Sequence, residues 1–277
     1  MMREDISILM AVYNHEATLI HALDSALTQE MPYSSKIYCI NDASTDNSAV
    51  ILAEYARNYP DKIFIFTSNE NQGSGKKAFL HNKPPAEGRY WCLLAGDDYW
   101  TTPDKLNQQL AFLDDNEEYV GCSCNTVMRK ELDGTESIIK PDCEDWNILD
   151  TMLLSNRYRF YVHTGSIVWR NIYLDKGFFL PPDFRKSYAS GDVLLAHMML
   201  ESGMKMHNID KVMSCYRVTG KGVWTSKTPE QQKQSNLEIA TNLKRATPIK
   251  YRLYARMNGL KVKLPLLGKF IPGPING

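Results

Sequence analysis

Acidic residues follow short apolar segments at several points of the chain. Asp97 and Asp98 come just after an apolar run that ends at Ala95, and Asp42 follows another run at Asn41. Neighbouring carboxylates repel each other, which a bound cation would offset. Mg²⁺ and Mn²⁺ take hard oxygen ligands, commonly one or two carboxylates completed by phosphates and water. The pair therefore indicates a divalent-cation site, while a polar turn remains the alternative because Asp is a common turn former.

A further carboxylate, Asp192, follows Ser190 and Gly191 and opens a segment with helical periodicity. At the start of a helix, Asp commonly caps the backbone N–H groups. The dipole at that position also keeps a carboxylate ionised and able to accept a proton. The residue types leave both roles open: a helix cap or a general base. If Asp192 is only a cap, the base would have to be another group, such as Asp183 or His163.

The first 125 residues alternate between apolar runs and helix-spaced segments. The runs predict strands over Ile6–Val12, Lys36–Asn41, Lys62–Thr67, Arg89–Ala95 and Tyr119–Met128. Helices are predicted over Glu16–Gln29, over Asp46–Asn58 with Ser44 or Thr45 as cap, from Gly75 to His81, and from Thr102 as cap to Asp114. This alternation predicts βαβ units in a mostly parallel sheet. Ligands of such sheets bind beyond the carboxyl ends of the strands, where the strand order reverses.

The second half of the chain is less regular. Strands are predicted over Gly165–Arg170 and Val212–Val218, and helices over Asp192–Ser202 and Thr228–Arg245. Near residue 130 the pattern changes without a linker, which favours one continuous domain.

The composition is that of a soluble globular protein. The 277 residues are 43% apolar and 23% charged, and no apolar run reaches the roughly 18 residues of a membrane-spanning helix. The N-terminus lacks the pattern of a signal peptide. Six cysteines fit neither a zinc site nor a disulfide framework, which predicts reduced, mostly buried thiols in a cytoplasmic protein.

The net charge of zero is unevenly distributed. Eight basic and no acidic residues lie between Lys244 and Gly277, which leaves 24 basic and 32 acidic residues before them, a net charge of −8. An acidic body argues against a nucleic-acid partner. Residues 249–271 mix basic with apolar side chains, as interfacial segments do, and predict peripheral membrane contact. The alternative is a helix folded back on the acidic body.

Five segments resemble, in order and spacing, the family-2 glycosyltransferases with the GT-A fold. They are Ile6–Asn14 (ISILMAVYN), Asn41–Ser48 (NDASTDNS), Gly88–Trp100 (GRYWCLLAGDDYW), Ser190–Asp192 (SGD) and, less closely, Tyr216–Trp224 (YRVTGKGVW). The resemblance implies an α/β, GT-A Rossmann-like single domain with a mostly parallel central sheet flanked by helices, followed by a basic C-terminal helical tail. The domain would span residues 1–227, with a nucleotide-binding half (1–128) and an acceptor-binding half (129–227), and the extension residues 228–277.

The resemblance also implies roles for individual residues. Tyr13 and Asp42 would bind the nucleoside, with Ala11 and Asn14 in the same donor-binding segment. Asp97 would contact the ribose or sugar, and Asp98 would bind the Mn²⁺ or Mg²⁺ that bridges the donor diphosphate. Further roles fall on Asp192 as general base and on Lys76 and Lys77 facing the diphosphate, although basic residues on a helix commonly form a solvated face. Tyr99 and Trp100 directly follow the acidic pair and could form the floor of the acceptor site, while Trp100 could equally belong to the core.

Four positions depart from the family pattern. Ala11 stands where Pro is common, Asn41 replaces an Asp, Ala43 replaces a Gly, and Thr219 stands where His is frequent. Asn41 lacks the charge of the usual Asp, which bears on donor affinity. Thr219 lacks the imidazole of the usual His, which bears on metal coordination.

The function implied is that of a metal-dependent, inverting hexosyl- or N-acetylhexosaminyltransferase. It would move a sugar from a UDP-sugar to a hydroxyl of a glycan or lipid-linked saccharide, as in bacterial surface-polysaccharide assembly at the inner face of the cytoplasmic membrane. A catalytically silent partner protein of the same fold is one alternative. A sugar nucleotidylyltransferase is another, although the AVYNHE turn lacks the Gly-rich loop with Arg and Lys that such enzymes carry. A receiver-like signalling module is disfavoured, because such a module would place its acidic pair after the first strand, whereas the pair here follows the fourth.

Overall fold

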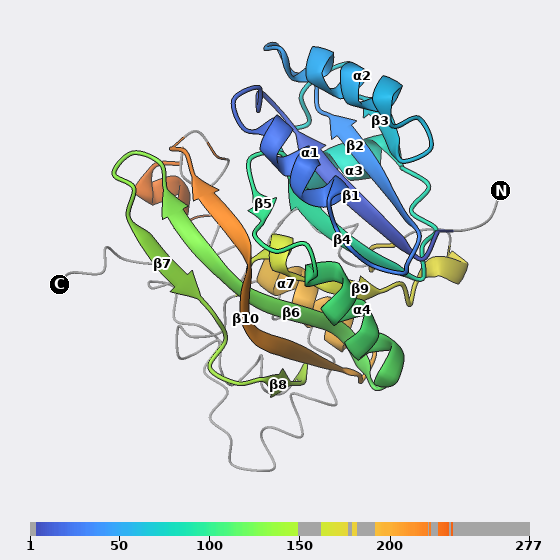
Figure 1. The fold of residues 1–277 in the computed structure, drawn as a ribbon. Coiled ribbons are helices and arrows are strands. Elements are labelled where there is room, and N and C mark those ends of the chain that lie inside the picture. Colours follow the sequence, from blue (N-terminus) through green and yellow to red (C-terminus); the bar gives the residue numbers. More distant parts are fainter. Residues whose placement is uncertain are drawn as a thin grey trace.

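A ten-stranded sheet runs through the part of the chain that the computed structural model describes, residues 4–148, 162–176, 179–181, 192–220, 222, 227–232 and 234 (Figure 1). Its strands are β1 (Ile6–Val12), β2 (Ser35–Asn41), β3 (Ile63–Thr67), β4 (Tyr90–Ala95), β5 (Tyr99–Trp100), β6 (Tyr119–Lys130), β7 (Glu136–Ile139), β8 (Asp145–Trp146), β9 (Val168–Arg170) and β10 (Lys205–Val218). The helices are α1 (Leu19–Leu27), α2 (Ser48–Asn58), α3 (Gly75–Asn82), α4 (Lys105–Asp115) and α7 (Asp192–Leu200), with 3₁₀ turns η1 (Thr164–Ser166) and η2 (Leu174–Lys176).

The strand order is β3-β2-β1-β4-β9-β6-β10-β5, with β7 on β6 and β8 on β10. Strands β3, β2, β1 and β4 are parallel, and so are β6 and β10. Only the short strands β5, β7, β8 and β9 run antiparallel to their neighbours. The predicted α/β fold with a mostly parallel sheet is confirmed. Since β1 lies between β2 and β4, the strand order reverses at the carboxyl ends of β1 and β4.

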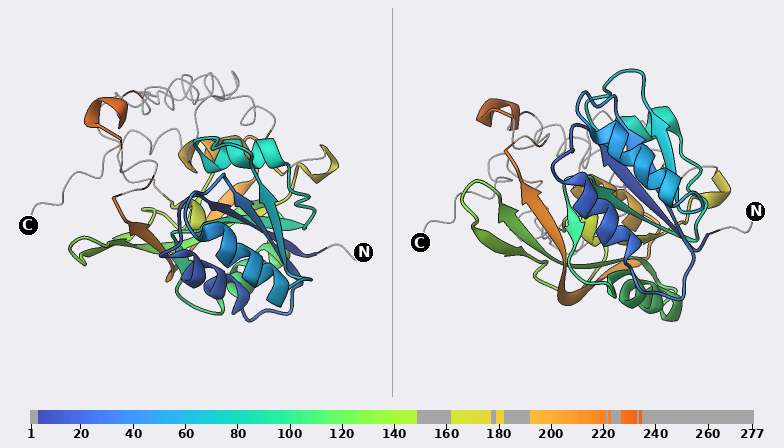
Figure 2. Two further views of the ribbon diagram at one scale, coloured as in Figure 1. Left: turned by 90° about the horizontal axis from the view of Figure 1, so that it is seen from above. Right: turned by 45° about the horizontal axis from the view of Figure 1, so that its top comes forward.

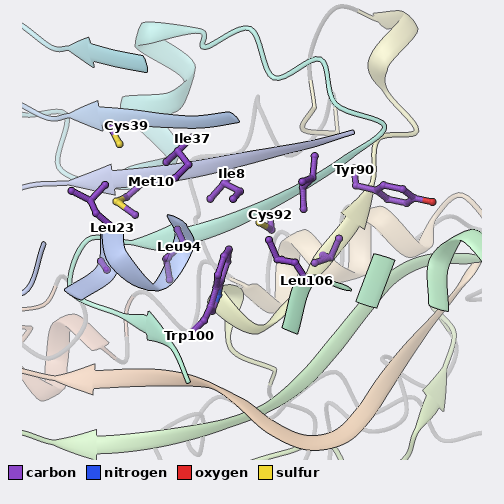
Figure 3. Close-up of a cluster of buried hydrophobic side chains, with 14 of the residues drawn as sticks. Ile8, Met10, Leu23, Ile37, Cys39, Tyr90, Cys92, Leu94, Trp100 and Leu106 are labelled. Carbon is purple, nitrogen blue, oxygen red and sulfur yellow. The ribbon is translucent and has the colours of Figure 1, made fainter. Parts of the chain in front are cut away.

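Two apolar clusters cover the two faces of the sheet. One joins β1 and β4 to α1, α2 and α4, and includes Leu52. Leu23 and Leu106 of the same cluster are labelled in Figure 3. The other joins the opposite face to α3 and α7, through residues such as Phe79 and Leu195. Figure 2 shows α1 and α2 on one side of the sheet and α3 on the other. The continuous apolar runs of β1 and β4 follow from this arrangement, because both of their faces are buried.

The predictions for the second half of the chain need correction. Strand β10 begins at Lys205 instead of Val212, and its pairing with β6 shifts register around Ile209 and Val212. These bulges break the period-2 pattern, so the first part of the strand does not read as one. The strand predicted to begin at Gly165 begins at Val168, because Thr164–Ser166 form η1.

The predicted helix caps are also wrong. The N-cap residue of α2 is Asn47 rather than Ser44 or Thr45. That of α4 is Asp104 rather than Thr102. Ser44 and Thr45 instead bind Asn14, Ser44 through its hydroxyl and Thr45 through its backbone N–H, so they link two loops.

Predictions for the C-terminal extension fall largely outside the described residues, as does most of the helix predicted over Thr228–Arg245, and the division at 227 stays a prediction. In the described part of the chain, no helix is long and apolar enough to cross a membrane. Five cysteines are buried and Cys143 is partly buried.

Candidate active site

The loops after β1 and β4 are pressed together at the point of strand reversal. The Gly96 N–H donates to the carbonyl of Ala11 at 3.0 Å, and the Thr18 hydroxyl donates to the carbonyl of Gly96 at 2.9 Å. A Cβ at Gly96 would lie 2.7 Å from Nδ1 of His15. Only glycine allows this approach, which brings Asp97 beside the loop that carries Tyr13.

The loop after β1 is locked to the loop after β2. Asn14 adopts a left-handed conformation with φ of 56°, which Asn tolerates better than most residues. Its N–H donates to Oγ of Ser44 at 3.1 Å, and its side-chain oxygen accepts from the N–H of Thr45 at 2.8 Å. These bonds use the polar groups of Asn14, while Tyr13 beside it is 43% exposed. The structure thus leaves the Tyr13 ring accessible to a planar ligand.

Asp42 is buried beneath the loop that follows β3. It is 4% exposed, and both carboxylate oxygens lie 3.0 Å from the N–H of Gln72. Asn41 accepts from the N–H of Ser44 at 3.0 Å, so this Asn stabilises the turn. Ala43 between them has a φ of 58°, the conformation that the glycine of the family pattern favours.

Asp97 and Asp98 face different partners. Asp97 Oδ2 lies 3.8 Å from Nε2 of His15. Asp98 is 4% exposed; its Oδ1 accepts from the N–H of Arg217 at 3.0 Å, and its Oδ2 lies 3.4 Å from Nε2 of His163. The two carboxylates are thus directed to different neighbours, and Asp98 is the one that the backbone holds in place.

Burial shifts two pKa values on the donor side of the site. It lowers the pKa of His15 more than Asp97 and Asp46 raise it. Burial, with a smaller effect from Lys77, lowers the pKa of Lys76 to about 8. Both lysines lie in the first turn of α3, which approaches β1 so closely that a Cβ at Gly75 would lie 3.0 Å from that of Ala11. Lys76 is half-buried and Lys77 exposed.

Of the two positions considered for Trp100, acceptor floor or core, the structure supports the core. Trp100 is 4% exposed, lies in the core shown in Figure 3, and donates from Nε1 to the carbonyl of Gly165 at 2.8 Å. Strand β5 alternates its side chains, so burying Trp100 turns Tyr99 to the other face. The Tyr99 and His21 rings stack with their centroids 3.9 Å apart, and Cζ of Arg217 lies 4.7 Å from the centroid of the Tyr99 ring. Tyr99 stays a prediction for the acceptor site.

The profile of the family described as Glycosyl transferase family 2 matches residues 7–175. This segment contains β1, β2 and β4 with the site residues at their ends. The chain belongs to glycosyl transferase family 2.

Relatives of this family-2 chain come from several bacteria. An uncharacterized protein of Mycobacterium tuberculosis is 28% identical over 82% of the chain, which spans 63% of that relative's length. The E. coli protein named UDP-Glc:alpha-D-GlcNAc-diphosphoundecaprenol beta-1,3-glucosyltransferase WfaP is 26% identical, with 93% of this chain and 94% of the relative covered.

Solved structures of glycosyltransferases share the fold. S. aureus TarS in complex with UDP-GlcNAc is 18% identical with a TM-score of 0.60, covering 95% of this chain and 76% of that one. The Pyrobaculum calidifontis mannosyltransferase PcManGT, in complex with GDP-Man and Mn²⁺, is 14% identical with a TM-score of 0.58, covering 93% and 80%.

Asp192 is the first residue of α7 in this family-2 chain, as predicted, but its side chain lies outside the described residues. Asp183, the other carboxylate considered as a base, lies wholly outside the described residues. The catalytic role of Asp192 therefore stays a prediction.

Sequence reasoning missed several residues that shape the site. Gln72 holds Asp42, Arg217 holds Asp98 through its backbone, and His15 faces Asp97. His163 was considered only as an alternative base, and the structure places it beside Asp98. His15 follows the donor-binding segment and Arg217 lies within the YRVTGKGVW segment, so both were within reach of the motif comparison. Gln72 and His163 belong to no motif, and their roles depend on the three-dimensional fold.

The residues at Asp98 fit a divalent cation held jointly with substrate. Asp98 offers carboxylate oxygens, the hard ligand type that Mg²⁺ and Mn²⁺ take, and its Oδ1 is oriented by the backbone N–H of Arg217. Among the described residues, no group of three or more His, Cys, Asp or Glu side chains could hold a metal ion alone. Mg²⁺-type sites commonly combine one or two carboxylates with substrate phosphates and water. A cation at Asp98 would thus depend on the donor diphosphate for the rest of its ligands.

Proposed function

We propose that this protein is an inverting, metal-dependent glycosyltransferase that moves a hexosyl or N-acetylhexosaminyl group from a UDP-sugar to a hydroxyl of a saccharide acceptor. One observation carries the proposal. In a family-2 chain, the ends of β1, β2 and β4 present Tyr13, Asp42 and Asp98 around one point of strand reversal. A ligand at this point would touch an aromatic ring, a buried carboxylate and a second carboxylate in sequence.

The nucleoside would bind at the ends of β1 and β2. The exposed Tyr13 ring offers a face on which uracil stacks. Asp42 accepts from one protein N–H, that of Gln72, and has lone pairs left to accept the uracil N3–H. Because its carboxylate is already oriented by Gln72, little ordering would be needed on binding. Ala11 and Asn14 would border the nucleoside, and their backbone groups are bound to the neighbouring loops.

The diphosphate would lie between Asp98 and the first turn of α3. Lys76 would place a positive charge near the phosphates, with Lys77 at the more exposed edge, and Asp97 would contact the ribose or the sugar. A Mn²⁺ or Mg²⁺ ion held by Asp98 and the diphosphate would neutralise the charge that develops on the leaving group. Asp98 in turn is kept in position by the backbone of Arg217.

The acceptor would approach from the side of α7. Asp192, at the start of that helix, would take the proton from the attacking hydroxyl while the bond to the nucleotide breaks on the opposite face of the sugar. A general base contributes roughly 10²–10⁴-fold to such a reaction.

The relatives support a UDP donor and a lipid-linked acceptor. WfaP matches over nearly its whole length, and its name gives UDP-Glc as donor and a diphosphoundecaprenol-linked sugar as acceptor. TarS was solved with UDP-GlcNAc. We extend this chemistry to the present chain: a UDP-sugar and a saccharide carried on a lipid diphosphate, reached at the inner face of the cytoplasmic membrane.

The test is release of UDP from UDP-Glc and UDP-GlcNAc, with a lipid-linked GlcNAc diphosphate as acceptor, in Mn²⁺, in Mg²⁺ and in EDTA. Asp98→Asn should lose at least about 100-fold in turnover. Asp115→Asn, which removes an exposed carboxylate at the end of α4, is the matched control. Full turnover of Asp98→Asn in EDTA would contradict metal dependence. Donor binding without turnover on any acceptor would favour the silent partner protein instead.

A further inference from the structure

His163 stands directly against the carboxylate proposed to hold the cation. It is 7% exposed, and its Nε2 lies 3.4 Å from Oδ2 of Asp98. The N–H of Gly165 donates to its other ring nitrogen, Nδ1, at 3.3 Å. A neutral imidazole that accepts at Nδ1 carries its proton at Nε2. The proton of His163 therefore sits on the nitrogen that lies 3.4 Å from Oδ2 of Asp98.

The imidazole is fixed from a second direction by β10. The rings of His163 and Tyr216 stack with centroids 4.6 Å apart and planes 23° from parallel. The next residue, Arg217, donates its N–H to the other oxygen of Asp98. One strand thus braces the histidine and binds the carboxylate that the histidine faces.

The turn that carries His163 is anchored to the core. Gln109 of α4 donates from Nε2 to the carbonyl of Ser166 at 2.8 Å, and Trp100 donates to that of Gly165 at 2.8 Å. The Ser166 hydroxyl closes the turn by donating to the carbonyl of His163 at 2.7 Å. Trp100 therefore contributes to the site indirectly, by holding η1.

A buried lysine orients Gln109. Lys105 is fully buried and donates from Nζ to Oε1 of Gln109 at 2.7 Å, with its Nζ 4.5 Å from the centroid of the Trp100 ring. With its oxygen bound in this way, the Gln109 amide must present its nitrogen to the η1 backbone. Burying a lysine ammonium without a hydrogen-bond partner costs free energy, and the Gln109 side chain supplies that partner here.

We infer that His163 is a positioning residue for Asp98: its Nε2–H fixes the carboxylate that would hold the divalent cation jointly with the diphosphate. This inference rests on the proposed function and adds a residue that the family resemblance does not assign. Groups that orient a metal ligand commonly change metal affinity by about 10–100-fold when they are removed. Loss of the donor at His163 should therefore weaken binding of the cation with its diphosphate.

The test separates hydrogen-bond donation from packing. His163→Phe keeps a ring to stack on Tyr216 but has no donor, whereas His163→Gln loses the ring and keeps an N–H donor near the position of Nε2. His163→Met, of similar length and without a donor, is the second donor-free variant in case the phenylalanine is not accommodated. Mn²⁺ binding in the presence of UDP is measured for each by electron paramagnetic resonance, with melting temperature recorded in parallel.

The inference predicts at least about tenfold weaker Mn²⁺ binding in the Phe and Met variants, and binding within about threefold of wild type for Gln. Unchanged binding in the Phe variant, or equal loss in all three, would show that the residue only packs and would overturn it. Wild-type protein that binds UDP but no Mn²⁺ would overturn the metal proposal itself, and this inference with it. Wild-type protein that binds neither would contradict the proposed function as a whole.

Discussion

At the scale of single residues, the surroundings of each carboxylate decide its use. Asp97 and Asp98 are adjacent in sequence, yet one faces His15 and the other His163 and the backbone of Arg217. Asp42 is as buried as Asp98 and is held by a backbone N–H of another loop. Each of these side chains is oriented before any ligand arrives, which reduces the cost of ordering them on binding.

Asp192→Asn should lower turnover by roughly 10²-fold or more, because asparagine keeps the size and the capping ability of the residue but cannot accept a proton. Donor affinity and melting temperature should change little, since the first turn of α7 keeps its polar side chain. Steady-state kinetics with titration of UDP and a thermal melt provide the three measurements. Turnover within tenfold of wild type would make Asp192 a helix cap and move the search for the base to other acceptor-side groups.

The pH dependence of donor binding should report on Lys76. Its pKa is lowered from the ordinary 10.5 to about 8, so its charge is present at pH 7 and largely lost by pH 9. If that charge faces the diphosphate, affinity for a UDP-sugar should fall by roughly three- to tenfold over this range. Lys76→Arg stays charged and should show a flat profile, which isothermal titration at several pH values would reveal. A wild-type profile that is equally flat would place Lys76 away from the phosphates.

The same shift has a consequence for folding. Because the pKa of Lys76 is lower in the folded chain, the unfolded chain binds more protons between about pH 8 and 10.5. The contribution of Lys76 to stability therefore rises with pH across that window.

At the scale of elements, the site is built from turns that follow strands. The turn after β1 and the turn after β2 both contain a residue with positive φ, Asn14 and Ala43. Asn14 fits this conformation through its bonds to Ser44 and Thr45. Ala43 has a Cβ that is unfavourable there, which costs about 1–2 kcal/mol relative to an unstrained backbone.

Ala43→Gly should stabilise the protein, since glycine removes that strain at a smaller cost in unfolded-state entropy. We expect a gain of about 0.5–1 kcal/mol in the free energy of unfolding, measured by urea denaturation. Ala53→Gly, at an exposed position within α2, is the matched control and should lose about 1 kcal/mol. Loss of stability in both variants would contradict the strain assigned to Ala43.

At the scale of the whole molecule, charge separates the body from the C-terminal tail. The first 243 residues carry a net charge of −8, and eight basic residues follow without an acidic one. Basic residues near an anionic bilayer contribute about 1 kcal/mol each. Attachment through the tail would bring the domain to a lipid-linked acceptor.

Vesicles containing phosphatidylglycerol should bind the full chain in a salt-dependent manner. Glutamine at six basic tail positions should weaken this binding at least about tenfold; the positions are Lys250, Arg252, Arg256, Lys261, Lys263 and Lys269. Six exposed basic residues of the body serve as the matched control: Arg57, Lys62, Lys83, Lys130, Lys140 and Lys205. Equal binding by both variants in a sedimentation assay would reject the membrane role of the tail.

The amino-acid sequence by itself determined the parallel half of the fold. The runs at Ile6–Val12 and Arg89–Ala95 are apolar throughout because both faces of a central strand are buried, and this pattern is visible without a structure. The motifs after these strands and after Lys36–Asn41 resemble those of family-2 glycosyltransferases and so pointed to Tyr13, Asp42 and Asp98, at the strand ends where such a sheet binds ligands. Local signals of this kind depend on neighbouring residues only.

Only the tertiary structure decided which residues surround the predicted ones. The contact of His163 with Asp98 joins positions 65 residues apart, and that of Arg217 with Asp98 spans 119. Trp100 directly follows the acidic motif and Tyr99, yet the pairing of β5 with β10 turns it into the core. No local pattern encodes these outcomes, because they depend on which strands pair and on where η1 packs against α4.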